Sequence, residues 1–232
     1  MLAPAIVILA AGLGVRLGRP FPKPLTQLRD GRSILEQQWR SLTTAFPDSP
    51  IHIVVGFKHE LIMEAFPDAL FVYNPDYSET NTSKSLLRAL RLIRGSGVVW
   101  LNGDVVFDPR LLDELGPWVQ SDRSVVCVND ARVAEEEVKY SLDGDGNVAA
   151  LSKQVEAPLG EAVGINFVAE GDRRTLVRHL EDCDDQDYFE RGIETAIAAR
   201  ELVIRPVDVS RYLAIEVDTE DDLGAANAAL EQ

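Results

Sequence analysis

The sequence predicts an α/β protein built around a doubly wound, mainly parallel mixed sheet. Two observations lead to this prediction. Short apolar runs of strand length alternate with longer segments of helical periodicity, which is typical of βαβ units. The first run, over residues 6–9, is apolar at every position, as expected of a central strand that is covered on both faces.

Helix signals are clear in the first half of the chain. Ser33, with Glu36 three positions later, forms the capping-box pattern and predicts a helix over 33–44. The aliphatic side chains between Leu86 and Ile93 follow a 3.6-residue period and predict a helix over 83–94. The other elements of this half are expected as strands at 51–55, 70–73, 98–101 and 124–128 and helices at 58–65 and 109–119.

The pattern changes after about residue 130. Two runs, 138–142 and 148–151, flank the turn Asp143-Gly144-Asp145-Gly146 and predict a β-hairpin. The later elements are expected as strands at 164–168 and 203–207 and helices at 173–181, at 188–199 and after Thr219. We predict a single domain over residues 1–232, in which about 1–130 binds a nucleotide and about 131–232 covers it with a small hairpin and helical subregion.

The composition limits the functions that are possible. The chain is 46% hydrophobic, which is enough for a sizeable core, and no apolar stretch has the length of a membrane helix. The N-terminal apolar run leads into a glycine turn and is interpreted as a core strand, not a signal peptide. Cys127 and Cys183 lie far apart without metal-site spacing, so we expect reduced thiols in a cytoplasmic protein.

The net charge of −15 argues against nucleic acids and anionic membranes as partners. The acidic run Glu135-Glu136-Glu137 is expected to be a solvated face. An anionic ligand would need a local cluster of cations and the help of a divalent metal. The sequence leaves an oligomer possible.

Such a cluster follows the first strand. Gly12 and Gly14 allow a tight turn whose backbone N–H groups point toward a ligand. The guanidinium group of Arg16 can bind phosphate oxygens through two parallel hydrogen bonds, and the ammonium group of Lys23 can bind them as a point charge. We therefore expect a nucleoside triphosphate here, the alternative being a plain strand–turn–helix with a surface arginine and lysine.

Two better-known glycine motifs are excluded at this turn. The dinucleotide fingerprint requires G-x-G-x-x-G, and Gly18 comes one position too late for it. The Walker A loop requires G-K-[ST], and the sequence contains no such tripeptide.

The stretch from Leu9 to Leu25 resembles the L-A-A-G-x-G-x-R…P-K-x-L signature of the nucleotidyltransferases that activate sugar phosphates and related phosphomonoesters. The resemblance implies a glycosyltransferase-A-like variant of the Rossmann fold. One departure is Val15, where the family often has Thr or Ser, so that one hydroxyl contact to phosphate is lost. The resemblance assigns nucleotide contacts to Leu9, Ala10, Ala11, Gly12, Gly14 and, further on, Gly103.

Two aspartates lie where a metal could be held. Asp104 leaves an apolar strand, and Asp218 ends another strand just before a helix. Ligands of open α/β sheets bind at such strand ends, and Mg²⁺ takes one or two carboxylates together with substrate phosphates. The family's G-D step and E-x-D-[ST] motif, which match here, imply the same two ligands. The alternatives are a turn residue at Asp104 and a helix N-terminal charge at Asp218, with Thr219 as the cap.

The segment from Asn74 to Leu86 is similar to the N-x-x-Y…T-N-x-x-S-L stretch of the phosphocholine and inositol-phosphate cytidylyltransferases. Amide and hydroxyl groups such as those of Asn81 and Ser85 could read the edge of cytosine, which favours CTP. The alternative interpretation is a series of N-cap residues that opens the helix. The residues assigned to the nucleotide by this resemblance are Asn74, Thr80, Asn81 and Ser85.

A third resemblance concerns the acceptor. The family's i-x-K…G-E-x-x-G-I stretch matches Lys153, Glu161 and Gly164, and its Y-x-E element matches Tyr188 and Glu190. It implies that Lys153 approaches the acceptor phosphate while the other four line the acceptor pocket. An aromatic ring with carboxylates would suit a cationic head group. The alternatives are an exposed lysine, a loop carboxylate and an ordinary helix start.

Together these patterns predict a Mg²⁺-dependent nucleotidyltransferase that joins CTP to a small phosphomonoester or phosphonate such as phosphocholine, an aminoalkylphosphonate or an inositol phosphate. A hexose-1-phosphate enzyme that uses UTP, GTP or dTTP, or a molybdenum-cofactor nucleotidyltransferase, is the nearest alternative. A non-catalytic nucleotide-sensing domain is the alternative of another class.

Overall fold

The computed structural model describes residues 3–131, 133 and 137–230, so Glu135 and Glu136 of the acidic run lie outside the described residues. The strands are β1 (Ala5–Ala10), β2 (Ile51–Val55), β3 (Leu70–Tyr73), β4 (Val98–Asn102), β5 (Val105–Phe107), β6 (Val125–Asn129), β7 (Lys139–Leu142), β8 (Val148–Ser152), β9 (Gly160–Val168), β10 (Arg205–Asp208) and β11 (Ala214–Glu216). The helices are η1 (Lys23–Leu25, a 3₁₀ turn), α1 (Ile34–Ala45), α2 (His59–Ala65), α3 (Thr82–Leu92), α4 (Leu111–Gln120), α5 (Glu170–Glu181), α6 (Phe189–Ala198) and α7 (Glu220–Leu230).

A mixed sheet runs through the centre of the molecule in the order β10-β6-β9-β4-β1-β2-β3, with the hairpin β7–β8 attached through β7 to β9. Neighbours pair in parallel except along β9, which runs antiparallel to both β4 and β6. β5 and β11 form a separate antiparallel pair. The predicted mainly parallel sheet is therefore confirmed, with β9 as its antiparallel member.

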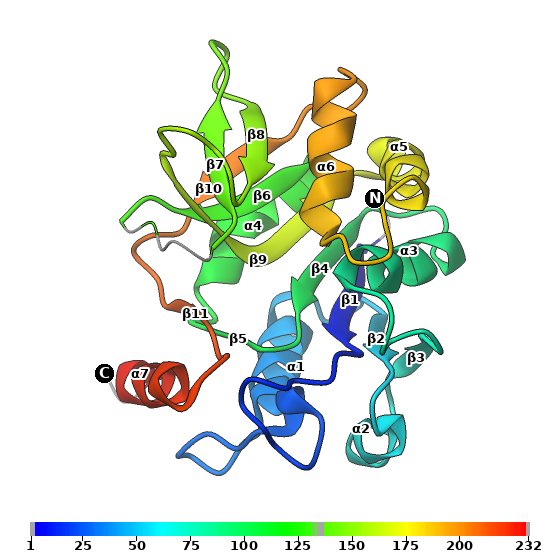
Figure 1. The fold of residues 1–232 in the computed structure, drawn as a ribbon, viewed down its shortest axis with the longest axis vertical. Coiled ribbons are helices and arrows are strands. Elements are labelled where there is room, and N and C mark those ends of the chain that lie inside the picture. The colour runs from blue at the N-terminus through cyan, green and yellow to red at the C-terminus, as the bar shows by residue number, and fades with distance from the viewer. Residues whose placement is uncertain (1–2, 132, 134–136, 231–232) are drawn as a thin grey trace.

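Helices cover both faces of the sheet, as the doubly wound arrangement requires (Figure 1). One core forms where α3, α5 and α6 pack over the face that carries Trp100. A second core forms where α1, α2 and α4 pack over the face that carries Ile8. The first strand is buried at all six positions, which confirms that it is central.

Local sequence signals match the observed helix starts. Ser33 caps α1, and the reciprocal hydrogen bonds of the capping box with Glu36 are both present. Thr219 and Asp222 make a similar pair of bonds at the start of α7, which confirms Thr219 as the cap. Strands β2 and β3 have the predicted bounds.

Several elements differ from the prediction. α5 begins at Glu170 rather than at 173, and β10 spans Arg205–Asp208 rather than 203–207. β9 begins at Gly160 rather than at 164, because residues 161 and 162 pair with β6. The short strand β5 was not predicted, since it has only three residues and is formed by pairing with β11, which is the strand expected just before Asp218. Among the described residues, no helix is both long and apolar enough to cross a membrane.

Candidate functional site

A cavity of about 400 Å³ opens beside the ends of β1 and β4. It receives side chains from both halves of the chain, so the predicted nucleotide residues and the aspartates meet in one place. Of the predicted site residues, those that line it are Leu9, Ala10, Gly12, Gly14, Arg16, Lys23, Thr80, Asn81, Asp104, Tyr188 and Asp218.

The glycine turn is built around Lys23. Gly14 has a positive φ of 60°, and a Cβ atom at this position would lie 2.8 Å from the Cβ of Lys23. A side chain there would therefore be strained and would collide with the lysine. The close contact fixes the base of the Lys23 side chain against the turn.

Glycine is required at position 103 because the backbone there lies close to the carbonyl oxygen of Leu9. The N–H of Gly103 donates to the carbonyl oxygen of Leu9 at 2.9 Å, and a Cβ atom would lie 2.7 Å from that oxygen. This contact joins the ends of β1 and β4. Gly103 therefore supports the cavity without lining it, as does Ala11, whose carbonyl accepts from Phe57.

The β5–β11 pair brings the two aspartates together. Asp104 lies between β4 and β5, and Asp218 follows β11. Glu216 is in register with Val105, and the N–H of Val217 donates to the carbonyl of Asp104 at 3.0 Å. The strand pairing thus places carboxylates from two distant parts of the sequence side by side.

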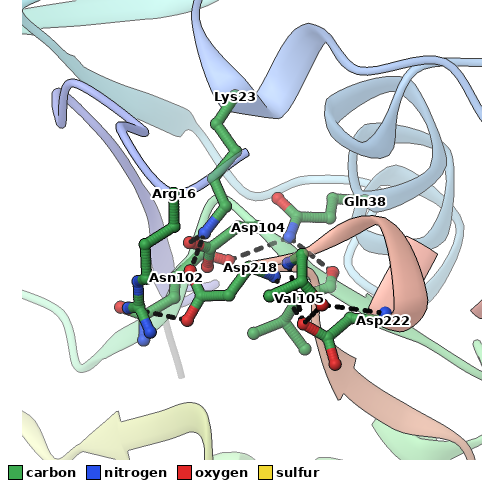
Figure 2. Close-up of polar contacts among 9 residues, drawn as sticks. Arg16, Lys23, Gln38, Asn102, Asp104, Val105, Asp218 and Asp222 are labelled. Atoms are coloured by element: carbon green, nitrogen blue, oxygen red, sulfur yellow. Dashed lines mark hydrogen bonds and ion pairs between the residues drawn. The ribbon is translucent and has the colours of Figure 1, made fainter. Parts of the chain in front are cut away.

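Two cations contact these carboxylates directly, as Figure 2 shows. The Nζ of Lys23 donates to Oδ2 of Asp104 at 2.6 Å and also to Oδ1 of Asp218. A guanidinium nitrogen of Arg16 lies 2.7 Å from Oδ2 of Asp218. Burial by itself would lower the pKa of Lys23, but Asp104 and Asp218 outweigh it and raise the pKa above its ordinary value.

Glu216 is a functional candidate that the sequence analysis did not single out. Its carboxyl group lines the cavity, and the neighbouring charge of Asp104, followed by burial, raises its pKa to about 9. The E-x-D motif contains this residue, so the motif was a usable signal. The motif does not reveal the pairing of β5 with β11, which brings Glu216 close to Asp104.

The aspartates fit the predicted magnesium ion in their chemistry. Oδ1 of Asp104 is buried and has no hydrogen-bond partner among the described residues, which leaves a carboxylate oxygen available to a cation. Carboxylate oxygens are the ligands that Mg²⁺ prefers. Among the residues that the structure describes, no three or more acidic, histidine or cysteine side chains are arranged as a ready metal site, so two carboxylates with substrate phosphates remain the expected set. The carboxylate of Asp108, four residues after Asp104, accepts hydrogen bonds from the side chain of Arg110.

The predicted base-reading residues divide into two groups. Thr80 and Asn81 line the cavity, whereas Asn74 and Ser85 are buried beneath it. The side-chain amide of Asn74 donates to the hydroxyls of Thr80 and Ser85, both at 3.1 Å. Asn81 also caps α3, as the alternative interpretation expected. Asn74 and Ser85 are therefore placed to hold the segment that carries Thr80.

This segment is joined to the loop before α6. The N–H of Asn81 donates to the carbonyl of Asp185 at 2.7 Å, and the side chain of Gln186 donates to the carbonyl of Glu79 at 2.6 Å. The two loops consequently form one wall of the cavity. For this reason Tyr188, at the end of the second loop, lines the same cavity as Thr80 and Asn81.

The predicted acceptor residues surround Tyr188 or lie in the neighbouring sheet. The Nζ of Lys153, just after β8, is 5.0 Å from the centre of the Tyr188 ring. Glu190 is buried in the first turn of α6, whose start at Phe189 agrees with the alternative of a helix start. Glu161 is buried in β9 and, together with Glu137 and Glu216, borders a smaller hollow. Gly164 lies against the Asn102 side chain, behind the cavity.

Burial raises the pKa of Glu190 to about 7, although Lys153 partly offsets it. The folded protein therefore favours the neutral acid, whereas the unfolded chain ionises at its ordinary pKa of 4.5. The free energy of unfolding is expected to fall by about 3 kcal/mol as the pH rises from about 4.5 to about 7, and to keep the lower value above pH 7.

Glu190→Gln should remove this penalty. The free energy of unfolding of the variant, relative to the wild type, is expected to increase between pH 5 and pH 8 in urea titrations followed by circular dichroism. Glu64→Gln, an exposed glutamate of α2, is the control and should give a pH-independent difference. A flat difference for Glu190→Gln would contradict the assigned cause.

Comparisons with known proteins identify the family and the fold of the chain. The model of the MobA-like NTP transferase domain matches residues 6–201. The CMP-5'-(3-aminopropyl)phosphonate synthase of Streptomyces rubellomurinus is 30% identical over 244 residues, which cover 93% of this chain and 37% of that protein. The chain thus spans little more than a third of this relative's length.

Another curated relative matches over almost its whole length. The 2-aminoethylphosphonate cytidylyltransferase of Lancefieldella rimae is 24% identical over 230 residues, which cover 94% of this chain and 90% of that protein. Among solved structures, the inositol-1-phosphate CTP transferase from T. maritima superposes with a TM-score of 0.78 at 15% identity, covering 99% of this chain and 97% of the other. At this identity the likeness concerns the fold alone, which is that of the glycosyltransferase-A-like nucleotidyltransferases.

Proposed function

Because the chain belongs to the MobA-like NTP transferase family, we propose that it is a cytidylyltransferase that transfers the cytidylyl group of CTP to an aminoalkylphosphonate or a related phosphomonoester. The observation that carries the proposal is the convergence of Arg16, Lys23, Asp104 and Asp218 in one cavity. The acceptor class is supported by the two curated relatives, whose names specify aminoalkylphosphonates.

The reaction needs no nucleophile from the protein. An oxygen of the acceptor phosphonate attacks the α-phosphorus of CTP and forms a new P–O bond. The bond between the α-phosphorus and the bridging oxygen breaks, and pyrophosphate leaves. Arg16, Lys23 and the N–H groups of the glycine turn would hold the triphosphate in line for this attack, so the protein works by positioning and charge stabilisation.

Asp104 and Asp218 would hold the magnesium ion, and Glu216 would lie beside them. When bound, Mg²⁺ supplies charge neutralisation at the phosphoryl oxygens. Around it, Lys23 and Arg16 can exchange their present carboxylate partners for phosphate oxygens. The buried oxygen of Asp104, to which no described residue donates a hydrogen bond, supports this assignment.

The preference for CTP rests on Thr80 and Asn81, whose polar groups border the cavity. Asn74 and Ser85 would position this segment from beneath. Lys153 would orient the acceptor phosphonate. The surroundings of the other end of the acceptor would be formed by Glu161, Gly164, Tyr188 and Glu190. Carboxylates and one aromatic ring suit an ammonium group there.

The free thiols of Cys127 and Cys183 support a cytoplasmic location.

The test is a pyrophosphate-release assay with Mg²⁺, in which CTP, UTP, GTP, ATP and dTTP are each combined with five acceptors. The acceptors are 2-aminoethylphosphonate, phosphocholine, inositol-1-phosphate, glucose-1-phosphate and mannose-1-phosphate. Turnover is expected with CTP and the aminoalkylphosphonate. Turnover with a hexose phosphate and another nucleotide would keep the nucleotidyltransferase and overturn the base and acceptor assignments. Nucleotide binding without any turnover would favour the sensing domain.

A further inference from the structure

Lys23 bridges the two carboxylates that we assign to the metal. Its Nζ lies 2.6 Å from Oδ2 of Asp104 and also donates to Oδ1 of Asp218. The side chain is only 9% exposed, so the ammonium group is enclosed between the aspartates (Figure 2). A positive charge thus already lies in the space between the predicted metal ligands.

Asp218 has both oxygens engaged. Oδ1 accepts from Lys23, and Oδ2 pairs with Arg16 at 2.7 Å. Each oxygen of Asp218 thus already contacts a cationic side chain, and a divalent cation held by both aspartates would be repelled by the enclosed ammonium group of Lys23. Such a cation therefore requires one of the two side chains to leave.

The two side chains differ in their position. Arg16 approaches Asp218 alone and is 66% exposed, whereas Lys23 contacts both aspartates from within. The backbone of Lys23 is held between Pro22 and Pro24, and Gly14 packs against its Cβ, so its base is fixed. The flexible part of the chain is the tip, which can turn from the carboxylates to a phosphate.

We infer that Lys23 occupies the metal position in the nucleotide-free protein and opposes the binding of a divalent cation until a triphosphate draws the ammonium group away. The inference rests on the proposed function, because it takes Asp104 and Asp218 as the metal ligands. It makes an uncommon prediction: removing a residue that serves the reaction should improve metal binding by the free protein.

The experiment is a titration of the whole chain with Mn²⁺ in the absence of nucleotide and acceptor, with free Mn²⁺ read by electron paramagnetic resonance. Lys23→Met, which keeps the length of the side chain and removes its charge, is expected to bind Mn²⁺ at least about tenfold more tightly than the wild type. Arg16→Met is the matched control, since it also removes one positive charge beside Asp218. It should change the affinity by no more than about threefold, because its guanidinium is exposed and screened.

Circular dichroism would establish that each variant is folded, and Lys23→Gln would replace the methionine variant if that one does not fold. Folded Lys23 variants that bind Mn²⁺ no more tightly than the wild type would overturn the inference. Equal gains in the Lys23 and Arg16 variants would also overturn it, because net charge alone would then account for the result. The titration contains no CTP, so its failure and a failure of the turnover assay are distinguishable.

Discussion

Replacing Asp104 with asparagine is expected to lower the rate of nucleotidyl transfer by about three orders of magnitude, with only a small change in nucleotide affinity. Asparagine keeps the shape of the side chain and removes the charge that would hold the metal. The triphosphate contacts that we propose for Arg16 and the glycine turn would remain, so binding should be retained. Single-turnover pyrophosphate release and calorimetric titration with CTP would measure the two effects separately.

The matched control is Asp108→Asn. This aspartate lies a few residues further on, where its carboxylate is bonded to the backbone and side chain of Arg110. Its activity should stay within about twofold of the wild type, since a surface ion pair contributes little. Undiminished turnover by the Asp104 variant would remove this residue from the metal site.

Gly14→Ala is expected to have the second large effect. The added methyl group would meet the Cβ of Lys23 at 2.8 Å, on a backbone with a φ of 60°. Strain and overlap together should cost about 2 kcal/mol of stability, and the displaced lysine should lower kcat/KM by about a hundredfold. Urea unfolding and initial rates at low CTP concentration would measure both.

Gly12→Ala separates this contact from a general need for glycine in the turn. A Cβ atom at Gly12 would meet no atom of the described part of the chain within 4 Å, and the φ of Gly12 lies outside the left-handed range. Its free energy of unfolding should therefore stay within about 0.5 kcal/mol of the wild type. If both variants lose stability equally, the contact between Gly14 and Lys23 is not the cause.

The sequence by itself determined the features that depend on short range. Ser33 and Glu36 are three residues apart, so their capping box could be read directly, and the apolar run of β1 indicated a central strand. The glycine turn with Arg16 and Lys23 was likewise visible as a contiguous motif. These signals predicted the fold class and most helix starts, and they singled out residues that line one wall of the cavity.

Only the tertiary structure decided how distant segments combine. β5 and β11 have three residues each and little periodicity, and they exist because Val105 and Glu216 pair across the fold. The side chain of Gln38 supports this region by donating to the carbonyls of Asn102 and Val105 at 2.9 and 2.8 Å. No local pattern encodes such a pairing, since its stabilisation comes from partners far away in the chain.

The charges of the site depend on the same pairing. The sequence predicted that Asp104 and Asp218 converge at one edge of the sheet, but not that Lys23 lies between them or that Glu216 joins them. The pKa of Glu216 is raised to about 9 because Asp104 is its neighbour in space. Electrostatic interaction depends on distance and burial, which only the folded chain defines. The candidate site residues could therefore be predicted from the sequence, whereas their ion pairs and protonation states could not.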